Sequence, residues 1–579
     1  MRGPMKGSGD ALLRSATRYS AGRCLALCLL TVVTSGAGLL LPYVLGRTLD
    51  ALFAAHTAPA KDGAAHHWLL ICGVLLGGLM LLGACEDVLT GTTNARTTAW
   101  LRHRLVGHVL NVGPGATARF PAGDLVARLV GSTAQAGPAP ATVAALAATV
   151  ITPVGALVAL GLTDPWLVAA FLAGAPALAL LLRAFARASS DCVSAYQKAQ
   201  GDLATRLTEA IGGARTIAAA HTAERETARV LEPLPELRHQ GLRLWHVQGR
   251  ASAGAVALAP LLQIAVIATA GLLLLHDRLS VGELLAASRY AALATGVGML
   301  VGDIAALVRT RAAGQRLGDV LEQRAPAYGD TPLRAGGGRL ELRSVTARRD
   351  GRTVLDRLDL TVPAGETVAV VGVSGAGKST LAALAGRLAD PDEGTVLLDG
   401  VPLTELNRAE LRAAVGYAFE RPTLLGDTLA DTIALGPGPR TGDDERIVRA
   451  AEAARADTFV RRLPDGYATA CADAPLSGGE AQRLGLARAF AHGGRLLVLD
   501  DALSSLDMIT EREIAAALLR HTPGTTRLVV AHRATTAARA TTVAWLDGGR
   551  VRALGPHARL WRDPEYRAVF ASTQAEEVA

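Results

Sequence analysis

Long apolar runs follow one another through the first half of the chain and end near Val308. Each has roughly the 20 residues that an α-helix needs to cross the hydrocarbon core of a bilayer. The runs span residues 24–45, 68–89, 143–162, 166–182, 253–275 and 284–308. Helices buried in a soluble protein would give similar runs, but six of them together favour membrane spans. The pattern therefore predicts an all-α membrane domain of six helices over residues 23–312.

The pattern changes after the sixth run. Residues 313–338 are polar and contain Pro326, Pro332 and three consecutive glycines, which is typical of a linker. From residue 339, short β-rich runs alternate with helical patterns, which indicates an α/β domain over residues 339–573 with a tail at 574–579. The predicted fold class is a multi-domain membrane protein, in which the six-helix transmembrane domain precedes an α/β domain.

The distribution of charge orients the membrane domain. Residues 96–128 and 183–250 are long and rich in arginine, whereas the turns near Asp164 and at residues 276–278 are short. Basic residues mark the cytoplasmic side, so both ends of the domain are predicted to face the cytoplasm. We therefore expect a multi-pass protein of the cell membrane with a cytoplasmic segment at residues 1–22. The net charge of +7 reflects this topology, so we expect the lipid bilayer as a partner and no nucleic acid.

Two inner segments carry further signals. Residues 193–220 have helical periodicity and good helix formers, so the fourth and fifth helices are expected to extend far beyond the membrane. Residues 120–125 break helical periodicity and predict a short turn element that could dock on another domain. The six cysteines show neither metal-ligand spacing nor a disulfide framework.

A phosphate-binding loop is predicted in the α/β domain, because residues 372–380 match the pattern GxxxxGK[ST]. A short buried strand is predicted before it at 367–371, and a helix after it at 381–388. Backbone N–H groups of the glycine turn and the helix N-terminus would hold phosphate oxygens. Lys378 would reach the β- and γ-phosphates, and the Ser379 hydroxyl would bind Mg²⁺. The expected nucleotide-binding residues are Gly372, Val373, Ser374, Gly375, Ala376, Gly377, Lys378, Ser379 and Thr380.

Further motifs follow in a fixed order. Residues 476–480 read LSGGE and run into a predicted helix at 481–490, and an apolar strand at 496–500 ends in Asp500. Residues 504–507 read SSLD, and His532 follows the predicted strand 528–531. Each motif alone is weak, but together they resemble the ATP-binding cassette (ABC) transporter family over nearly the whole chain. Six membrane helices ahead of one P-loop NTPase cassette resemble an exporter-type half-transporter, which works as a dimer.

The resemblance implies ATP hydrolysis coupled to transport, with ATP and Mg²⁺ as cofactors. In such transporters ATP lies between the phosphate loop of one cassette and the signature of the other. Ser477, Gly478 and Gly479 would then contact ATP held by the partner, with the helix N-terminus near Glu480 aiding the γ-phosphate. The resemblance assigns Mg²⁺ to Ser379, Glu420 and Asp500, catalysis to Lys378, Asp501 and His532, and a link between the sites to Asp507. It also matches residues 123–125 and 209–216 to the two coupling regions.

Four positions depart from the family pattern. Asp501 stands where the catalytic base is usually Glu, and Glu420 stands where the Q-loop usually has Gln. Arg349 stands where an aromatic residue usually stacks on adenine, although a guanidinium can also stack on a base. Residues 469–475, before the signature, are shorter than usual and lack a Gly-Glu pair.

Two interpretations of these departures stay open. One is drift with full activity. The other is that the chain forms the slow ATP site of a heterodimer, so that its own hydrolysis is weak and a second half-transporter is its partner. An importer, a lipid flippase and a non-transporting ATPase that senses or regulates a partner are the alternatives in function. Export of a small peptide, natural product or drug is the family default. Arg289 lies inside the sixth run, and we hypothesise that it lines the translocation path and favours an anionic cargo, with snorkelling as the alternative.

Overall fold

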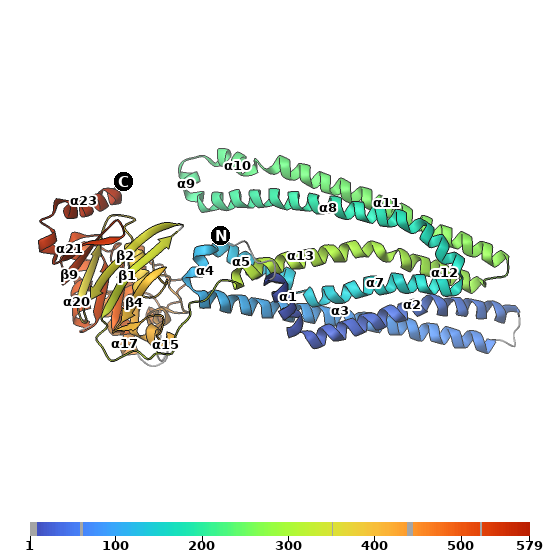
Figure 1. The fold of residues 1–579 in the computed structure, drawn as a ribbon, viewed down its shortest axis with the longest axis horizontal. Coiled ribbons are helices and arrows are strands. Elements are labelled where there is room, and N and C mark those ends of the chain that lie inside the picture. The colour runs from blue at the N-terminus through green and yellow to red at the C-terminus, as the bar shows by residue number, and fades with distance from the viewer. Residues whose placement is uncertain (1–7, 58–61, 350, 437–443, 522–523, 579) are drawn as a thin grey trace. The chain divides into compact units, whose positions relative to one another are not determined.

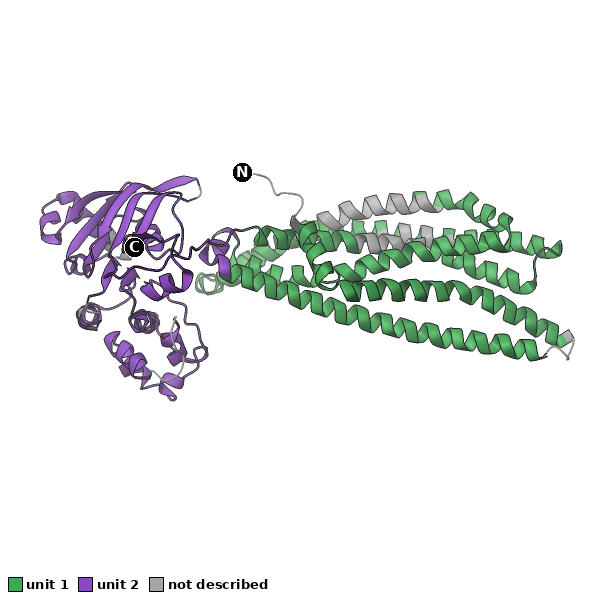
Figure 2. Ribbon diagram, turned by 60° about the horizontal axis from the view of Figure 1, so that its bottom comes forward, with its two compact units in different colours: residues 1–110, 120–323 green, residues 111–119, 324–579 purple. Residues whose placement is uncertain are grey.

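The computed structural model describes residues 8–57, 62–349, 351–436, 444–521 and 524–578. The chain forms two compact units, which are Met1–Leu110 with Phe120–Gln323, and Asn111–Arg119 with Arg324–Ala579 (Figure 2). We call them the membrane unit and the α/β unit. The first seven residues of the predicted N-terminal segment and Ala579 of the predicted tail lie outside the described residues.

The membrane unit consists of long helices joined by short ones (Figure 1). Its long helices are α2 (Ala21–Thr57), α3 (Asp62–Val112), α7 (Ala139–Thr163), α8 (Pro165–Gly212), α11 (Leu234–Leu275) and α13 (Gly298–Leu321). Its shorter elements are α1 (Ser8–Tyr19), α5 (Ala122–Ala127), the π-helical η2 (Arg128–Ser132), α6 (Thr133–Ala136), α9 (Ala214–Ala219), α10 (Ala223–Leu231), α12 (Val281–Ala294) and the 3₁₀ turn η3 (Thr295–Val297). The first five predicted spans fall within α2, α3, α7, α8 and α11.

The sixth predicted span, residues 284–308, is not one continuous α-helix. α12 ends at Ala294, and the 3₁₀ turn η3 precedes α13. Gly296 and Gly298 lie at this interruption, and each glycine inside a helix costs about 1 kcal/mol relative to alanine. The apolar run continued through the break, so hydrophobicity alone did not reveal it.

Several helices of the membrane unit expose apolar surface that is suited to contact with lipid or another subunit and unsuited to contact with water. Helical stretches long and apolar enough to cross a membrane are Ala21–His56, Gly63–Val112 and Ala122–Thr163 among the described residues, with shorter apolar stretches at Pro165–Ala177 and Pro260–Leu275. On α3, Leu70, Val74 and Met80 are 70%, 76% and 80% exposed within the chain. Exposed apolar patches of this kind are rare on soluble proteins, so these faces suit a bilayer.

The fourth and fifth helices do continue far beyond the length that a membrane requires. α8 has 48 residues and α11 has 42. At a rise of 1.5 Å per residue these are roughly 70 and 60 Å long, about twice the hydrocarbon core. Figure 1 shows α8 and α11 side by side, with α9 and α10 at their far end. There, Arg229 bridges Glu209 of α8 at 3.2 Å and Glu226 of α10 at 2.6 Å.

The prediction of a turn element at residues 120–125 was wrong in form, because residues 122–127 are the helix α5. Pro121 precedes the helix and fixes the entry of the chain. Asp124 lies in the first turn and accepts a hydrogen bond from Arg128 Nε at 2.9 Å. This pair four residues apart supports a helix that periodicity alone did not predict.

The first part of the predicted linker, residues 313–338, is helical, since α13 continues to Leu321. Ala313, Leu317 and Val320 are buried in a cluster with Leu12 and Leu101. This burial of an apolar stripe stabilises the extension of the helix.

Side chains order the turns at the opposite ends of the membrane helices. Asp164 caps α8 by accepting from the Trp166 N–H at 2.9 Å, and it pairs with Arg278 at 2.9 Å. Asp50 of α2 accepts hydrogen bonds from the Ser280 hydroxyl at 2.6 Å and from the Gly282 N–H at 2.8 Å. The short turns at Asp164 and at residues 276–278 are therefore tied to each other at this end.

The α/β unit contains two sheets. A four-stranded antiparallel sheet has the order β2-β1-β4-β5, and a six-stranded sheet has the order β10-β9-β3-β8-β7-β6 with parallel central strands. The strands are β1 (Leu340–Arg349), β2 (Arg352–Val362), β3 (Thr367–Val371), β4 (Glu393–Leu398), β5 (Val401–Pro402), β6 (Val415–Phe419), β7 (Leu496–Asp500), β8 (Thr526–Val530), β9 (Thr542–Asp547) and β10 (Arg550–Gly555). The helical elements are α4 (Pro114–Arg119), α14 (Lys378–Ala385), α15 (Arg408–Ala414), α16 (Leu429–Ala434), α17 (Asp444–Ala453), α18 (Asp457–Val460), the 3₁₀ turn η4 (Gly466–Ala468), α19 (Gly478–His492), α20 (Met508–His521), α21 (Ala534–Ala537), α22 (His557–Leu560) and α23 (Pro564–Val578).

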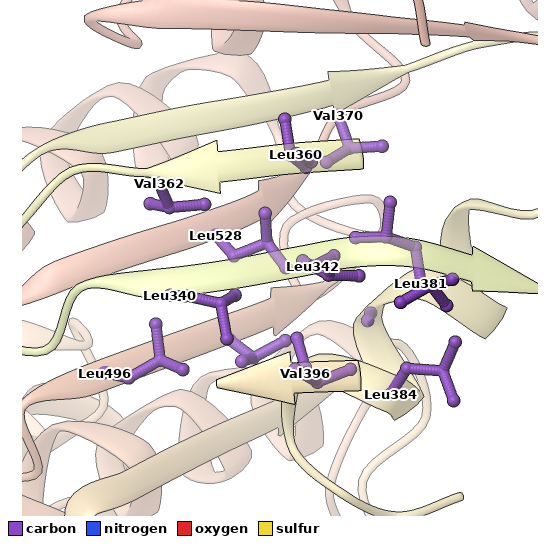
Figure 3. Packing of buried hydrophobic residues seen from close by; sticks show 14 of the residues in the cluster. Leu340, Leu342, Leu360, Val362, Val370, Leu381, Leu384, Val396, Leu496 and Leu528 are labelled. Atoms are coloured by element: carbon purple, nitrogen blue, oxygen red, sulfur yellow. The ribbon is translucent and has the colours of Figure 1, made fainter. Parts of the chain in front are cut away.

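The core of this unit lies between the two sheets and holds α14 in place. Leu381 and Leu384 of α14 are 0% and 1% exposed, and they belong to the same buried cluster as residues of both sheets (Figure 3). The labelled residues Leu340 and Val396 come from the antiparallel sheet, whereas Leu528 comes from the parallel one. Packing on both sheets fixes the N-terminus of α14 beside the end of β3.

Candidate active site

The candidate residues come from the carboxyl ends of neighbouring parallel strands. The phosphate loop follows β3, Asp500 is the last residue of β7, and Glu420 follows β6. His532 lies two residues after the end of β8. Because β3, β8, β7 and β6 are consecutive in the sheet, their ends form one edge. Ligands of open α/β sheets bind at this edge.

Two glycines give the phosphate loop its conformation. Gly375 and Gly377 have φ of +80° and +97°, in the region that favours glycine. A Cβ on Gly377 would lie 2.7 Å from Leu355 Cδ2 and 3.1 Å from the Val354 carbonyl oxygen. Gly377 also precedes the first turn of α14, which begins at Lys378 and ends at Ala385. The prediction of a helix at 381–388 was therefore displaced by three residues, since it followed apolar periodicity and ignored this cap.

Lys378 lies inside the loop that it is expected to serve. It is 6% exposed, and its Nζ donates to the carbonyl oxygens of Gly372 at 2.8 Å and Val373 at 3.0 Å. An ammonium group at a helix N-terminus, in a turn lined by backbone N–H groups, is well placed for phosphate oxygens.

The carboxylate of Asp500 suits a hard cation. Burial raises the pKa of Asp500, and the nearby Glu420 carboxylate adds to this, while hydrogen bonds from Ser379 and Tyr417 act in the opposite direction. Within the described residues, Asp500 Oδ1 is buried without a hydrogen-bond partner. A buried acceptor beside the Ser379 hydroxyl fits Mg²⁺, which prefers oxygen ligands and keeps several of its own waters. No group of three or more His, Cys, Asp or Glu side chains in the described ranges could hold a metal alone, so nucleotide phosphates would complete the ligand set.

Tyr417 is a site residue that sequence reasoning missed. Its hydroxyl donates to Asp500 Oδ2 at 3.4 Å, and its ring stacks on Phe419 with centroids 4.4 Å apart. Burial raises the pKa of Tyr417 well above its ordinary value, so the phenol stays protonated and remains a donor. No sequence motif predicts the role of Tyr417, because that role depends on the pairing of β6 with β7.

Asp501 and His532, both predicted to be catalytic, lie close together. His532 Nε2 is 3.7 Å from Asp501 Oδ2, and both side chains are partly exposed. Asp501 has φ of +53°, a left-handed conformation that Asp tolerates better than most residues. Glu420 is half exposed beside this edge, and its carboxylate is 3.7 Å from Arg421 Nε. The structure thus brings Lys378, Ser379, Glu420, Asp500, Asp501 and His532 to one edge of the sheet.

The signature lies on a different element, α19. This helix begins at Gly478, so the predicted start at Ala481, near Glu480, was two to three residues late. The Ser477 hydroxyl accepts from the Glu480 N–H at 3.3 Å, while the Glu480 carboxylate accepts from the Ser477 N–H at 2.8 Å. The Glu480 carboxylate accepts hydrogen bonds from the Ser477 N–H and from the Ser477 hydroxyl, and both lower the pKa of Glu480. Gly478 and Gly479 occupy the first turn, where backbone N–H groups have no partner within the helix.

The other departures from the family pattern lie in exposed or looped positions. Arg349 is exposed at the end of β1 and faces Arg352 in the register of β1 and β2. In the segment before the signature, Thr469 O accepts from the Leu429 N–H at 3.1 Å, and the Cys471 N–H donates to Asp427 O at 3.1 Å. The segment is therefore ordered by backbone pairing with the residues that lead into α16.

Gln482 of α19 is a second residue that sequence reasoning missed. It is 1% exposed, and its Nε2 lies 3.3 Å from the carbonyl oxygens of both Glu420 and Asp501. Its Oε1 accepts from the Ser505 N–H at 3.1 Å. The buried Gln482 amide therefore connects α19 to Glu420, Asp501 and Ser505.

We expect Gln482→Leu to lower kcat for ATP hydrolysis about 10- to 100-fold and to change KM for ATP by less than about threefold. The leucine leaves the buried carbonyl oxygens of Glu420 and Asp501 and the Ser505 N–H without this partner, at a free-energy cost of about 1–3 kcal/mol each. The Asp501 backbone is then no longer held in place, and a displaced catalytic group slows the reaction. The phosphate loop is untouched, so ATP affinity should persist. Steady-state ATPase of this chain in lipid without its partner would measure this split at the chain's own site, with Arg483→Ala on the same helix as the control. A rise in KM with kcat preserved would show that Gln482 does not position the hydrolytic side of the site.

The comparisons with known proteins agree with this geometry. The family model for the ABC transporter transmembrane region matches residues 24–297, and that for the ABC transporter cassette matches residues 355–504. The chain belongs to the ABC transporter family. It is 51% identical over 554 residues to the ABC transporter ATP-binding protein RamA of Streptomyces coelicolor. The aligned residues cover 95% of this chain and 86% of RamA.

Two other comparisons extend this result. An ATP-dependent lipid A-core flippase of Burkholderia pseudomallei is 33% identical over 384 residues, covering 63% of this chain and 62% of the flippase. The structure of a bacterial Atm1-family ABC exporter with ATP bound matches with a TM-score of 0.81 at 23% identity, covering 97% of this chain and all of that chain. The second match shows that the fold of this ABC transporter is that of an exporter.

Membership of the family establishes the general activity. The chain is a multi-pass membrane protein with a cytoplasmic cassette, and it couples ATP hydrolysis to transport across the membrane. Exporters of this family act as dimers in the membrane.

Proposed function

We propose that this chain is the slow-site subunit of a heterodimeric ABC exporter. The observation that carries the proposal is Asp501 in the position of the catalytic base, combined with an LSGG signature that is intact. The chain would bind ATP at its own phosphate loop and hydrolyse it slowly. Its Ser477, Gly478 and Gly479 would complete the faster site of a partner that supplies Glu.

The length of the Asp501 side chain is the physical basis of slow hydrolysis. Asp has one methylene less than Glu, which withdraws the carboxylate by roughly 1.5 Å. A displacement of about 1 Å in a catalytic group can cost about 100-fold in rate. His532 lies beside Asp501 and would still contact the γ-phosphate, so binding and hydrolysis would be affected differently.

The residues of the candidate site suit Mg²⁺ and ATP in the expected roles. Ser379 and Asp500 would hold Mg²⁺, with Glu420 near enough to influence the pKa of Asp500. Bound Mg²⁺ would neutralise charge on the β- and γ-phosphates. Lys378 would hold the same phosphates, and Arg349 would stack on adenine from the exposed end of β1.

The cargo is proposed to be a small peptide, natural product or drug. A lipid is the second candidate cargo, because one relative is named an ATP-dependent lipid A-core flippase. Arg289 is exposed on α12 of the single chain, between the buried residues Ala287 and Tyr290. This exposure supports a role for Arg289 at a surface that faces a cavity, a partner or lipid.

Subunit composition tests the proposal directly. Two copies of this chain with different affinity tags would be co-expressed with a second half-transporter that carries Glu as its catalytic base, and the complexes would be extracted into lipid nanodiscs. We expect each tag to recover the partner and to recover the other copy at background level. ATP-dependent uptake into inverted vesicles should require both genes. Stable recovery of one copy by the other, with uptake from this chain alone, would establish a homodimer and overturn the slow-site assignment.

A further inference from the structure

The membrane unit contains an acidic cavity between helices. It has a volume of about 230 Å³, and its polar lining consists of Glu86 and Thr90 of α3, Thr31 of α2 and Thr142 of α7. Alanines from α7 and α13, among them Ala145 and Ala306, form much of the remaining wall. The short side chains of these alanines leave the space open beside the carboxylate.

Glu86 lies on the face of α3 that points into the helix bundle. Residues 86, 90, 93 and 97 share one helical face by their spacing, and Thr93 and Thr97 are both 0% exposed. The next residue, Asp87, is exposed, as expected for a side chain turned about 100° away. The Thr31 hydroxyl, on a residue 2% exposed, donates to Glu86 Oε1 at 2.6 Å. Glu86 is therefore directed to another helix and to the cavity.

Two helices place the cavity at the cytoplasmic boundary of the hydrocarbon core. Glu86 is 18 residues from Trp68, which begins the apolar run of α3, so about 27 Å separates them along the helix axis. Thr142 is 21 residues from Thr163 at the end of α7, or about 32 Å. Both lengths are close to the roughly 30 Å of a bilayer core. A molecule moving from the cytoplasm into the membrane unit would meet Glu86 at the start of its path.

The carboxylate has unused capacity for a cationic ligand. A carboxylate offers about four acceptor positions, and the Thr31 hydroxyl fills one. Within the described residues, Glu86 forms no ion pair with Lys, Arg or His. Thr34 Oγ1, Thr93 Oγ1 and Asn94 Oδ1 are buried atoms that also have no hydrogen-bond partner in that part of the chain. An ionisable side chain at this depth normally pairs or serves a function.

We propose that Glu86 and its cavity bind the ammonium group of an amphipathic cargo. The carboxylate supplies the counter-charge, and the hydroxyl groups of Thr90 and Thr142 supply further acceptors for the three N–H donors of a primary ammonium. The alanine walls accept the adjoining apolar carbons. The inference rests on the proposed export function and deepens it by giving the cargo a positively charged, hydrogen-bonding end, at a place other than the one where Arg289 was expected to meet an anionic group.

Binding without ATP tests the site separately from transport. The probe is radiolabelled n-decylamine, bound to the complete transporter in nanodiscs, with empty nanodiscs subtracted and n-decanol as the uncharged match. Glu86→Gln should weaken decylamine binding at least about tenfold and leave decanol binding unchanged. The matched control is Asp87→Asn, which removes the neighbouring exposed charge and should leave both affinities unchanged. Ala145→Leu, which fills the cavity, should weaken both ligands.

The outcomes separate the site from the proposed function. Unchanged decylamine binding in Glu86→Gln, or an equal loss in Asp87→Asn, would overturn the site. If Glu86→Gln is poorly folded, loss of binding in Ala145→Leu together with a smaller loss in Thr31→Val would still support it, and retention of binding in both would overturn it. Glu86-dependent binding without ATP-driven uptake of decylamine would support the site and count against export of such cargo.

Discussion

Replacing Lys378 with alanine is expected to abolish ATP-dependent transport and to lower ATP turnover at this chain's site at least about 100-fold. The Lys378 ammonium group is almost fully buried in the phosphate loop, where it donates to two backbone carbonyl oxygens. When ATP is bound, the same group would meet the charge that builds on the phosphates. Removal of one preorganised donor at such a site typically costs a factor of 10² to 10³.

The measurement for Lys378→Ala is vesicle uptake and steady-state ATPase in a complex where it is the only change. Lys198→Ala is the matched control, because Lys198 is an exposed lysine on α8 and lies outside the cassette. A second measurement is the shift in Tm caused by MgATP, which should become smaller in the variant, because only the partner's phosphate loop still binds ATP tightly. Transport at an unchanged rate would mean that this ATP site is not required for turnover.

The sequence predicted the parallel strands of the site well. The predicted strands 367–371 and 496–500 match β3 and β7 residue for residue, because both are short apolar runs buried in the middle of a sheet. The phosphate loop and Asp500 follow from these strands. Long apolar runs likewise placed five of the six spans. These features depend on local hydrophobicity and on short motifs, which one sequence displays directly.

The helix boundaries were harder to predict, because caps set them. α14 starts after Gly377 in a left-handed conformation, and α19 starts after Ser477 in a capping box with Glu480. Apolar periodicity begins later in both helices than the hydrogen-bonded turn. A search for Ser-x-x-Glu at residues 477–480 would have corrected α19.

Tyr417 and Gln482 were missed for a different reason. Tyr417 reaches Asp500 only because β6 and β7 pair in parallel, and Gln482 reaches Asp501 only because α19 packs against the loops after β6 and β7. The cavity beside Glu86 is likewise formed by residues of α2, α7 and α13. Contacts between residues far apart in the sequence define these roles, so the residue type alone carried no signal.

Asp501→Glu is expected to raise the ATPase activity of the chain purified without its partner, from a low value by about 10- to 100-fold. A general base must lie within hydrogen-bond reach of the attacking water, and the longer side chain restores that reach. The backbone at position 501 is left-handed, with φ of +53°. That conformation is less common for Glu, so a small loss of stability should accompany the gain in rate.

The asymmetry of the two ATP sites is checked by changing the signature of the same chain. Ser477→Arg should abolish ATP hydrolysis by the two-chain complex, because the arginine side chain would occupy the space of the γ-phosphate of the ATP that the partner's phosphate loop binds. Ser477 also caps α19, so Ser477→Asp is the matched variant that keeps the cap and still repels phosphate. Asp501→Asn in the complex should change total turnover little if the fast site is the partner's. Vigorous ATPase of the lone wild-type chain, unimproved by Asp501→Glu, would identify an ordinary homodimer in which Asp501 is an adequate base.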